Sequence, residues 1–424
     1  MLSCGEASGD LYAGALTREL LGIDPSLRIA GLGGPQFKDA GGQLIDDYRD
    51  IAVTGLTEAI RKVPRSLAAL RRLVAAARRD RPDALVVIDS PDFNFRLAPQ
   101  VKRLGVPIIY YISPQIWAWR PGRLNTIRGF ADRVLVIFPF EETIYREAGV
   151  PVEFVGHPLV DLARPTASRA EFLTRRGLSS SAPTVAILPG SRPNEVSRIL
   201  PTLVAAARRI RRAVPGAQFV VARAPHLDDR LFDREGLEHR GAAFSGSRSA
   251  RLKAPHDDVV PVSDTVSHAP SDTVSDTNFV VVEGDTDTVL ASADVALTAS
   301  GTATVQCALH DTPMVIVYRV SPITYRLGRR LVTIDTIGMV NLIAGEKIVP
   351  ELVQDAFTPD AVAREATSVL TDRARSSQIR DGLARVRARL GGPGASRRAA
   401  EAILNIVRAH GRADPGAQRV TPTR

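Results

Sequence analysis

The sequence predicts an α/β protein built from two Rossmann-like, doubly wound domains with a cleft between them. Three observations lead to this fold class. Short apolar runs rich in β-branched residues alternate with helical segments, which is the pattern of parallel sheets joined by helical crossovers. These runs form two series, one in each half of the chain. The length of 424 residues also exceeds that of one ordinary hydrophobic core.

The first series of predicted strands comprises 84–89, 107–112, 133–138 and 152–155, with helices expected at 64–79 and 96–104. A Gly-rich loop begins at Gly5, so almost no strand precedes it, although a Rossmann unit normally begins with a full strand. Pro158 and Pro165 bracket the end of this series, and we place the first domain at 1–163.

The second series comprises 184–188, 218–222, 279–282, 294–298 and 314–318, with a helix expected at 200–214. We place the second domain at 164–375. Within it, 245–278 is rich in Ser, Asp, Thr and Pro and contains a near-repeat of Ser-Asp-Thr-Val-Ser. Such composition predicts a disordered surface insertion, and the tail 413–424 is also expected to be disordered.

Composition narrows the class of function. The 55 basic and 46 acidic residues give a net charge of +9, which favours anionic partners such as nucleotide phosphates, nucleic acid or an acidic membrane. Few aromatic residues, at 5%, argue against nucleic acid. No apolar run reaches the about 18 residues of a membrane span, and the start lacks the regions of a signal peptide, so we expect a cytoplasmic protein. Cys4 and Cys307 are expected to be reduced structural thiols.

Two Gly-rich segments precede helical stretches in the first domain. Segment 5–10 (Gly-Glu-Ala-Ser-Gly-Asp) leads into a helix whose free N–H groups could face an anion or a hydroxyl. A simple tight turn explains this segment equally well. Segment 31–35 (Gly-Leu-Gly-Gly-Pro) predicts a second turn of the same kind.

Asp89 ends a predicted buried strand, where open α/β sheets bind their ligands. It is therefore a candidate general base, and a structural hydrogen-bond anchor is the alternative. Asp92, three residues later, could be the N-cap of the next helix. Trp117 and Trp119 lie beside Arg120 after another strand, which suits packing on a sugar or acyl chain, although Trp117 could equally be a core residue.

Two loops of the second domain predict a diphosphate site. Gly190, Ser191 and Arg192 follow a strand and lead into a helix, offering backbone donors and a bidentate cation. Ser300, Gly301 and Thr302 repeat this design after a second strand. Because no Gly-Lys-Ser/Thr P-loop is present, ATP hydrolysis is not expected.

Apolar residues recur at spacings of three and four in a basic stretch of the first domain. The stretch 61–81 contains eight basic residues and one acidic residue. We expect an amphipathic helix, broken at Pro64, that contacts anionic lipid, while a core-facing helix remains the alternative. The expected membrane contacts are Leu56, Ile60, Arg61, Lys62, Val63 and Leu67.

Together these motifs resemble the lipid-A-disaccharide synthases, a family of inverting glycosyltransferases. The resemblance covers nearly the whole chain in order, apart from 245–278 and the tail. It rests on segments 5–10, 31–35, 89–94, 113–120, 140–141, 156–158, 188–192, 300–302, 314–319, 341–345 and 350–352.

The resemblance implies a GT-B fold and the joining of UDP-2,3-diacylglucosamine to 2,3-diacylglucosamine 1-phosphate, without a metal or other cofactor. It also implies a protein peripheral to the inner membrane. C-terminal helices at 376–412 are expected to return to the first domain or to exchange in a homodimer. By position, Asp89 resembles the catalytic carboxylate and Arg192 the donor-phosphate ligand.

The remaining site residues follow from the same positions. The donor-binding set is Gly190, Ser191, Arg192, Ser300, Gly301, Thr302, Gln306 and Asn341. The acceptor-binding set is Gly5, Glu6, Ser8, Asp10, Asp92, Asn94, Ser113, Gln115 and Trp117. His157, near the domain junction, fits a structural role at least as well as a catalytic one.

The chain departs from the family pattern at Gln306, where the family usually has Glu. Gln can still bond a ribose hydroxyl, but without charge assistance. Three alternatives therefore stay open: another GT-B enzyme such as a UDP-sugar 2-epimerase or a transferase with a polyprenyl-linked acceptor, an inactive UDP-sugar-binding relative, and a nucleic-acid binder.

Overall fold

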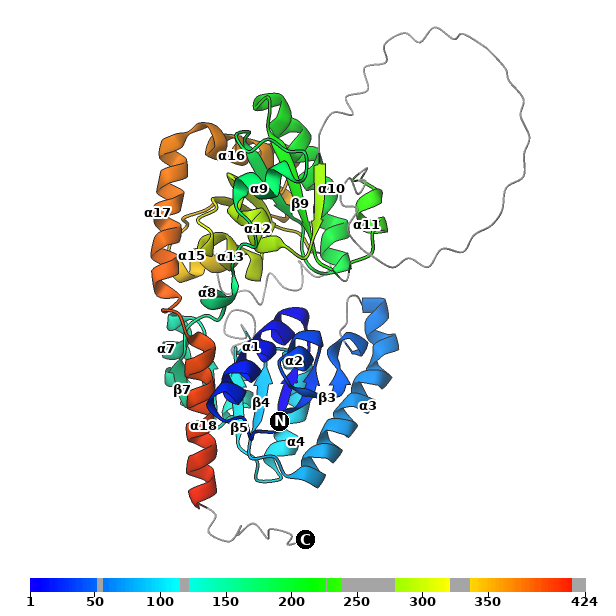
Figure 1. Cartoon of the computed structure of the whole chain (residues 1–424), viewed down its shortest axis with the longest axis vertical. Helices are drawn as coiled ribbons and strands as arrows, with labels where there is room; N and C mark the ends of the chain where they lie inside the picture. The colour runs from blue at the N-terminus through cyan, green and yellow to red at the C-terminus, as the bar shows by residue number, and fades with distance from the viewer. Residues whose placement is uncertain are drawn as a thin grey trace, which may run out of the picture.

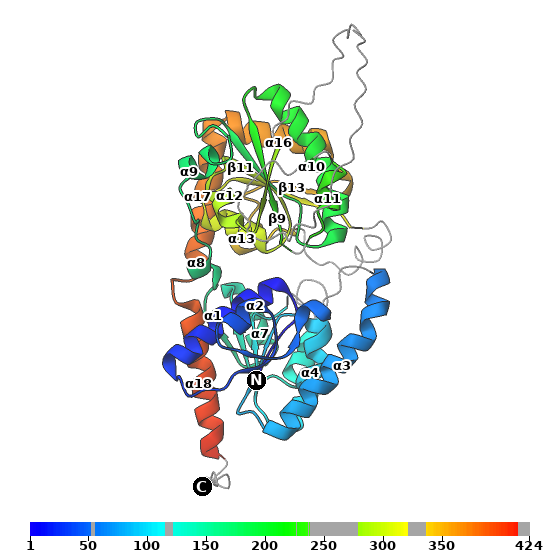
Figure 2. The same ribbon diagram turned by 45° about the vertical axis from the view of Figure 1, so that its right-hand side comes forward.

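The computed structural model describes residues 1–51, 56–114, 122–225, 227–235, 237, 279–320 and 336–413, and for 56–62 and 411–413 it describes the backbone alone. Two lobes are stacked along the long axis of the molecule (Figure 1). Each lobe has a parallel sheet at its centre with helices packed around it, and Figure 2 shows the same two lobes after a turn about this axis. The predicted α/β class with two Rossmann-like domains is confirmed.

The first sheet has seven strands in the order β3-β2-β1-β4-β5-β6-β7. Its strands are β1 (Leu2–Cys4), β2 (Ala30–Gly33), β3 (Gln43–Asp47), β4 (Leu85–Ile88), β5 (Ile108–Tyr111), β6 (Arg133–Val136) and β7 (Val152–Phe154). Its helices are α1 (Ala7–Ile23), α2 (Pro35–Asp39), α3 (Leu56–Asp80), α4 (Pro91–Lys102), α6 (Arg123–Arg128) and α7 (Pro139–Glu147), with a 3-10 turn at Tyr48–Asp50.

The second sheet has six strands in the order β10-β9-β8-β11-β12-β13. Its strands are β8 (Thr184–Leu188), β9 (Gln218–Arg223), β10 (Phe279–Glu283), β11 (Val295–Ala299), β12 (Met314–Tyr318) and β13 (Glu351–Val353). Its helices are α8 (Leu159–Leu162), α9 (Arg169–Thr174), α10 (Pro193–Ala213), α11 (Arg230–Asp233), α12 (Thr286–Ala291), α13 (Thr302–Leu309), α15 (Met339–Ala344) and α16 (Pro359–Thr371), with a 3-10 turn at Gln354–Ala356.

As expected, the strand before Gly5 is very short. β1 has only three residues, yet it lies in the middle of the first sheet and pairs in parallel with both β2 and β4. All three of its side chains are buried. A short strand is sufficient here because the neighbouring strands supply hydrogen bonds on both edges and the Leu2 and Cys4 side chains enter the core.

The predicted break at Pro64 is wrong, because this proline lies inside α3, a single helix of 25 residues. A proline removes one helical hydrogen bond. Downstream of it, one face of α3 packs on α4 and on β3, and Ala69, Leu73 and Ala77 are fully buried there. This packing offsets the loss of the bond.

The C-terminal segment spans both lobes. α17 (Arg373–Arg389) packs against α13, α15 and α16 of the second lobe, whereas α18 (Ala395–Ala413) packs along α1 of the first (Figure 1). Asp161 fixes the start of α18, because its carboxylate accepts the N–H groups of Gly394 at 2.8 Å and Ala395 at 3.2 Å. No helix in the described part of the chain is both long enough and apolar enough to cross a membrane.

Candidate active site

Both sheets change direction of winding at a point that faces the other lobe. In the first sheet the order reverses between β1 and β4, and in the second between β8 and β11. Ligands of open α/β sheets bind outside the carboxyl ends of the strands at such a switch point. The four loops that follow these strands contain Glu6, Asp89, Arg192 and Gly301, so the topology brings together the motifs that the sequence singles out.

Asp89 directly follows β4 and has a strained backbone conformation. Its φ is +44°, and Ser90 and Ile112 also have positive φ values of +47° and +55°. For residues other than glycine such angles cost about 1–3 kcal/mol each and cluster at functional sites. The Asp89 carbonyl accepts hydrogen bonds from Asn94 Nδ2 at 2.8 Å and from Tyr110 Oη at 2.9 Å. These bonds hold the turn that aims Asp89 at the cleft.

The environment of Asp89 raises the pKa of its carboxyl to about 6. Burial is the largest cause, because it disfavours the charged form, and repulsion from Glu6 adds to it. The N–H of Ser90 and the charge of Arg192 act in the opposite direction. A carboxylate with a pKa near the working pH is suited to accept a proton in a reaction.

The Gly-rich loop after β1 lies directly against the loop after β4. A Cβ atom added to Gly5 would come within 2.6 Å of Ser90 Oγ, so glycine is required for this approach. Asp10 is 2% exposed, and its carboxylate accepts the N–H groups of Gly34, Gln36 and Phe37 at 2.7–3.1 Å. Asp10 thus caps the N-terminus of α2, and its assignment to the acceptor site stays a prediction.

On the opposite lobe, the loop after β8 presents Arg192 to the first lobe. Gly190 has φ of +119°, and a Cβ there would meet Glu195 at 2.8 Å, so the sharp turn requires glycine. Arg192 Nη2 lies 2.8 Å from both carboxylate oxygens of Glu6 and forms an ion pair across the cleft. Ser191 lies beside it, exposed at the start of α10.

The loop after β11 begins α13. Ser300 Oγ donates to the Ile337 carbonyl at 2.9 Å, so its side chain fixes the loop. Gly301 has φ of +150° and, together with Thr302, is exposed at the N-terminus of this eight-residue helix. The backbone N–H groups of such a terminus favour anions and hydroxyls.

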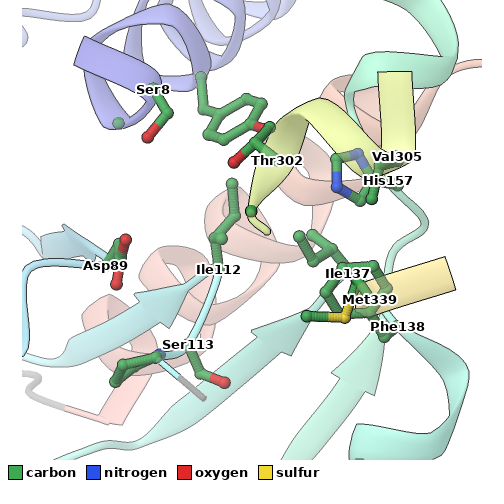
Figure 3. Close-up of a pocket in the computed structure, with 14 residues that line it drawn as sticks. Ser8, Asp89, Ile112, Ser113, Ile137, Phe138, His157, Thr302, Val305 and Met339 are labelled. Carbon is green, nitrogen blue, oxygen red and sulfur yellow. The ribbon is translucent and has the colours of Figure 1, made fainter. Parts of the chain in front are cut away.

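A cavity of about 200 Å³ lies between the lobes. Asp89, Ser8 and Ser113 line it from the first lobe, and Gly301 and Thr302 line it from the second (Figure 3). Ligand pockets are typically about 300–1,000 Å³, so the cavity is one part of a larger binding cleft.

One wall of this cavity was not predicted from the sequence. It consists of Tyr12, Ile112, Ile137, Phe138, Val305 and Met339. Helical spacing and apolar runs place such residues in a core as readily as in a cleft. His157, noted for its place near the domain junction, also lines this wall.

Three other predicted site residues have structural partners. Asn94 is fully buried, and its Oδ1 accepts from Ser3 Oγ at 2.8 Å. Asn341 is 2% exposed and makes four hydrogen bonds that hold residues 348–351. Gln306 Nε2 donates to Asp287 at 3.0 Å, one turn into α13. Asn94 and Asn341 therefore hold the loops beside the cleft through these bonds, and their assignment as ligand contacts stays a prediction.

Asp92 is not an N-cap. Pro91 takes the first position of α4, so Ser90 is the capping residue, and Asp92 follows as the second helical residue. Its side chain is 96% exposed, and its Oδ1 lies 3.9 Å from Arg123 Nη1. Gln115 and Trp117 lie outside the described residues, as do the side chains of Leu56, Ile60, Arg61 and Lys62.

Both cysteines are buried and free, as expected. Within the described ranges, no group of three or more His, Cys, Asp or Glu side chains could hold a metal ion.

The fold and the cleft define a GT-B protein, with two Rossmann-like domains that face each other. One solved structure of similar fold is UDP-GlcNAc 2-epimerase from Neisseria meningitidis bound to UDP-GlcNAc, with a TM-score of 0.60 over 93% of this chain and 96% of that chain. At 9% identity this likeness shows the fold alone.

Sequence comparison gives the family. The model described as lipid-A-disaccharide synthetase matches residues 1–241 and 259–407. The lipid-A-disaccharide synthase of Myxococcus xanthus is 41% identical over 96% of this chain and 97% of its own length. That of Syntrophus aciditrophicus is 40% identical with the same coverage. The chain belongs to the lipid-A-disaccharide synthase family, which confirms the resemblance seen in the sequence.

Proposed function

We propose that this chain transfers an acylated glucosamine from UDP-2,3-diacylglucosamine to 2,3-diacylglucosamine 1-phosphate, forming the lipid A disaccharide 1-phosphate and UDP. The family membership supports the reaction. One structural observation supports the site: the switch points of both lobes face each other, with Asp89 on one side and Arg192 and the α13 N-terminus on the other.

The chemistry assigns one role to each side of the cleft. The oxygen of the acceptor 6-hydroxyl attacks the anomeric carbon of the donor, and Asp89 accepts the proton that this hydroxyl loses. The bond from this carbon to the UDP oxygen breaks, and the electron pair leaves with the phosphate. Arg192 and the loop N–H groups after β8 and β11 stabilise the charge that develops there.

The reading that Asp89 is only a structural anchor is less well supported. Its turn is anchored through the backbone carbonyl, which leaves the side chain at the cavity wall. A structural carboxylate normally accepts several hydrogen bonds that lower its pKa, whereas the pKa of Asp89 is raised.

A substrate panel tests this function against its nearest alternative. The purified chain is incubated with EDTA and either the diacylated pair of substrates or UDP-GlcNAc alone. We expect the diacylated pair to give the disaccharide and UDP-GlcNAc to remain unchanged. Interconversion of UDP-GlcNAc at carbon 2 would support an epimerase, and UDP binding without turnover of either would support a binding protein.

We also propose that the chain works as a peripheral protein on the cytoplasmic face of the inner membrane, through α3. Val63 and Leu67 are 49% and 37% exposed, and they are the exposed large apolar residues of the described chain. Arg65, Arg71 and Arg78 are exposed on the same helix. Apolar side chains beside several cations favour binding to anionic lipid.

Co-sedimentation with vesicles containing anionic phosphatidylglycerol tests this contact. We expect Val63→Ser combined with Leu67→Ser to reduce binding, because less apolar surface enters the bilayer. Ala75→Ser, at an exposed position of the same helix, is the matched control. Equal binding of the double variant and the control would contradict the assignment.

The expected homodimer stays a prediction.

A further inference from the structure

His157 lies where the chain crosses between the lobes. It follows β7, and its backbone N–H donates to the Leu390 carbonyl at 2.8 Å, which joins the two crossing segments. A Cβ atom on Gly391 would come within 3.1 Å of the Gly156 Cα, so these segments are in close contact. The imidazole is therefore held at a fixed place at the junction.

The hydrogen bonds of His157 determine which ring nitrogen holds the proton. The backbone N–H of Leu159 donates to Nδ1 at 3.1 Å. A neutral imidazole has one donor and one acceptor nitrogen, so the proton is on Nε2. Burial lowers the pKa of His157 to about 3, and the ring is neutral at physiological pH.

No described residue bonds to this Nε2–H group, and the ring borders the cavity. His157 is 2% exposed, and its ring forms part of the wall of the cavity that also contains Asp89 and Thr302 (Figure 3). The rings of Tyr12 and Phe138 pack against it, with centroids 6.1 Å and 5.3 Å away. A ligand oxygen in the cavity that accepts this bond would therefore be favoured, because the donor has no described partner to exchange.

The surroundings of the donor select the kind of oxygen. A neutral N–H among apolar side chains suits a neutral acceptor, whereas phosphate is better matched by Arg192. Ile137, Val305 and Met339 line the same wall. Such a wall accommodates the first carbons of an acyl chain next to its carbonyl group.

We propose that His157 donates a hydrogen bond from Nε2 to an acyl carbonyl oxygen of a glucosamine substrate and so selects acylated sugars. This inference rests on the proposed transferase function. It assigns His157 to substrate binding and not to proton transfer, since the ring keeps its proton throughout.

Two substitutions separate the donor from the structural role of the ring. In His157→Asn, the side-chain oxygen can still accept the Leu159 N–H, but the Nε2 donor is lost. In His157→Gln, the amide nitrogen reaches about as far as Nε2 and can restore the donor. His410→Asn, on the exposed surface of α18, is the matched control.

The readout is kcat/KM for disaccharide formation, with UDP affinity and Tm measured in parallel. We expect a 10- to 100-fold loss in His157→Asn, a smaller loss in His157→Gln, and unchanged UDP affinity in both. Repeating the assay with the acyl groups removed from donor or acceptor in turn identifies the sugar involved. The effect of His157→Asn should disappear for the analogue that lacks the accepting carbonyl.

A measurement on the wild-type chain does not depend on the folding of any variant. The ¹⁵N resonances of the His157 ring should shift on addition of an acylated substrate and not on addition of UDP alone. Suppose that the wild type is active. If His157→Asn then has wild-type kinetics, or if the ring resonances of the wild type do not shift, the assignment of His157 is overturned and the proposed function is not. A wild type that makes no disaccharide would overturn the proposed function as well.

Discussion

Glu6 and Arg192 form a direct ion pair across the cleft between the two lobes. Both carboxylate oxygens of Glu6 lie 2.8 Å from Arg192 Nη2, although the residues are 186 positions apart. Each belongs to the loop after the first strand of its sheet. The arginine assigned to the donor phosphate is thus paired with a carboxylate, and this carboxylate also raises the pKa of Asp89.

Replacing Glu6 by Gln should strengthen UDP binding. Arg192 must exchange Glu6 for a phosphate, and the ion pair is half exposed, so it contributes at most about 1 kcal/mol. We expect the Kd for UDP, measured by calorimetry, to fall by up to about fivefold. Glu142→Gln, which removes a surface pair with Arg146, is the control. Weaker UDP binding in the Glu6 variant would show that Glu6 itself binds the donor.

The activity should decline as the pH falls below about 6, which gives the pH profile an acid limb. Asp89 accepts a proton only when ionised, and its pKa is about 6, so kcat/KM should be level above pH 7 and fall tenfold per pH unit below 6. In Glu6→Gln the limb should move to lower pH, because a repulsion that disfavours the ionised carboxylate is removed. An acid limb that does not respond to Glu6→Gln would assign the titration to another group.

Asp89→Asn should stabilise the protein at pH 8. The folded-state pKa of about 6 is above the ordinary value of 3.8, so the ionised carboxylate is disfavoured by folding. The variant removes this cost, which is at most about 3 kcal/mol at about 1.4 kcal/mol per pKa unit. The gain should shrink as pH falls from 6 to 4, because Asp89 becomes protonated in the folded state and, with its ordinary pKa of 3.8, partly protonated in the unfolded state. Chemical unfolding of both proteins at pH 8 and pH 4 measures it, and a loss of stability at pH 8 would contradict the account.

Asp10→Ala should destabilise the first lobe. The carboxylate accepts three backbone N–H groups at the start of α2, and two of these groups, at Gly34 and Phe37, form buried bonds. Removing a cap costs about 0.5–2 kcal/mol, and leaving buried donors unpaired adds to this. We expect a loss of about 2–4 kcal/mol in the free energy of unfolding. Asp24→Ala, which affects only the exposed Ser26, should cost much less.

Strand and loop patterns made much of this fold predictable. All nine predicted strands are present, because buried parallel strands form continuous apolar runs. β2, β3 and β13 were missed. β2 contains two glycines among its four residues, β3 contains Asp46 and Asp47, and β13 has only three residues. The compositions of β2 and β3 are not typical of a strand, and their pairing in the sheet overrides them.

The polar motifs were predictable in place but not in role. Asp89 and Arg192 do lie at the cleft, because residues after the central strands of a sheet must gather there. Asp10, Asn94 and Asn341 stand in equally suggestive motifs, yet each satisfies backbone groups inside the protein. Polar residues with short side chains serve both purposes, and only the three-dimensional contacts distinguish them.

The most direct test of the central claim is disaccharide formation by wild type, Asp89→Asn and Asp83→Asn under single-turnover conditions. Asp83 is an exposed residue that precedes β4, whereas Asp89 follows the same strand at the cleft. Removal of a general base typically costs about 10²–10⁴ in rate. We predict a loss of this size in Asp89→Asn and wild-type rates in Asp83→Asn. Rates for Asp89→Asn within a few-fold of wild type would contradict the claim that Asp89 accepts the proton in this cleft.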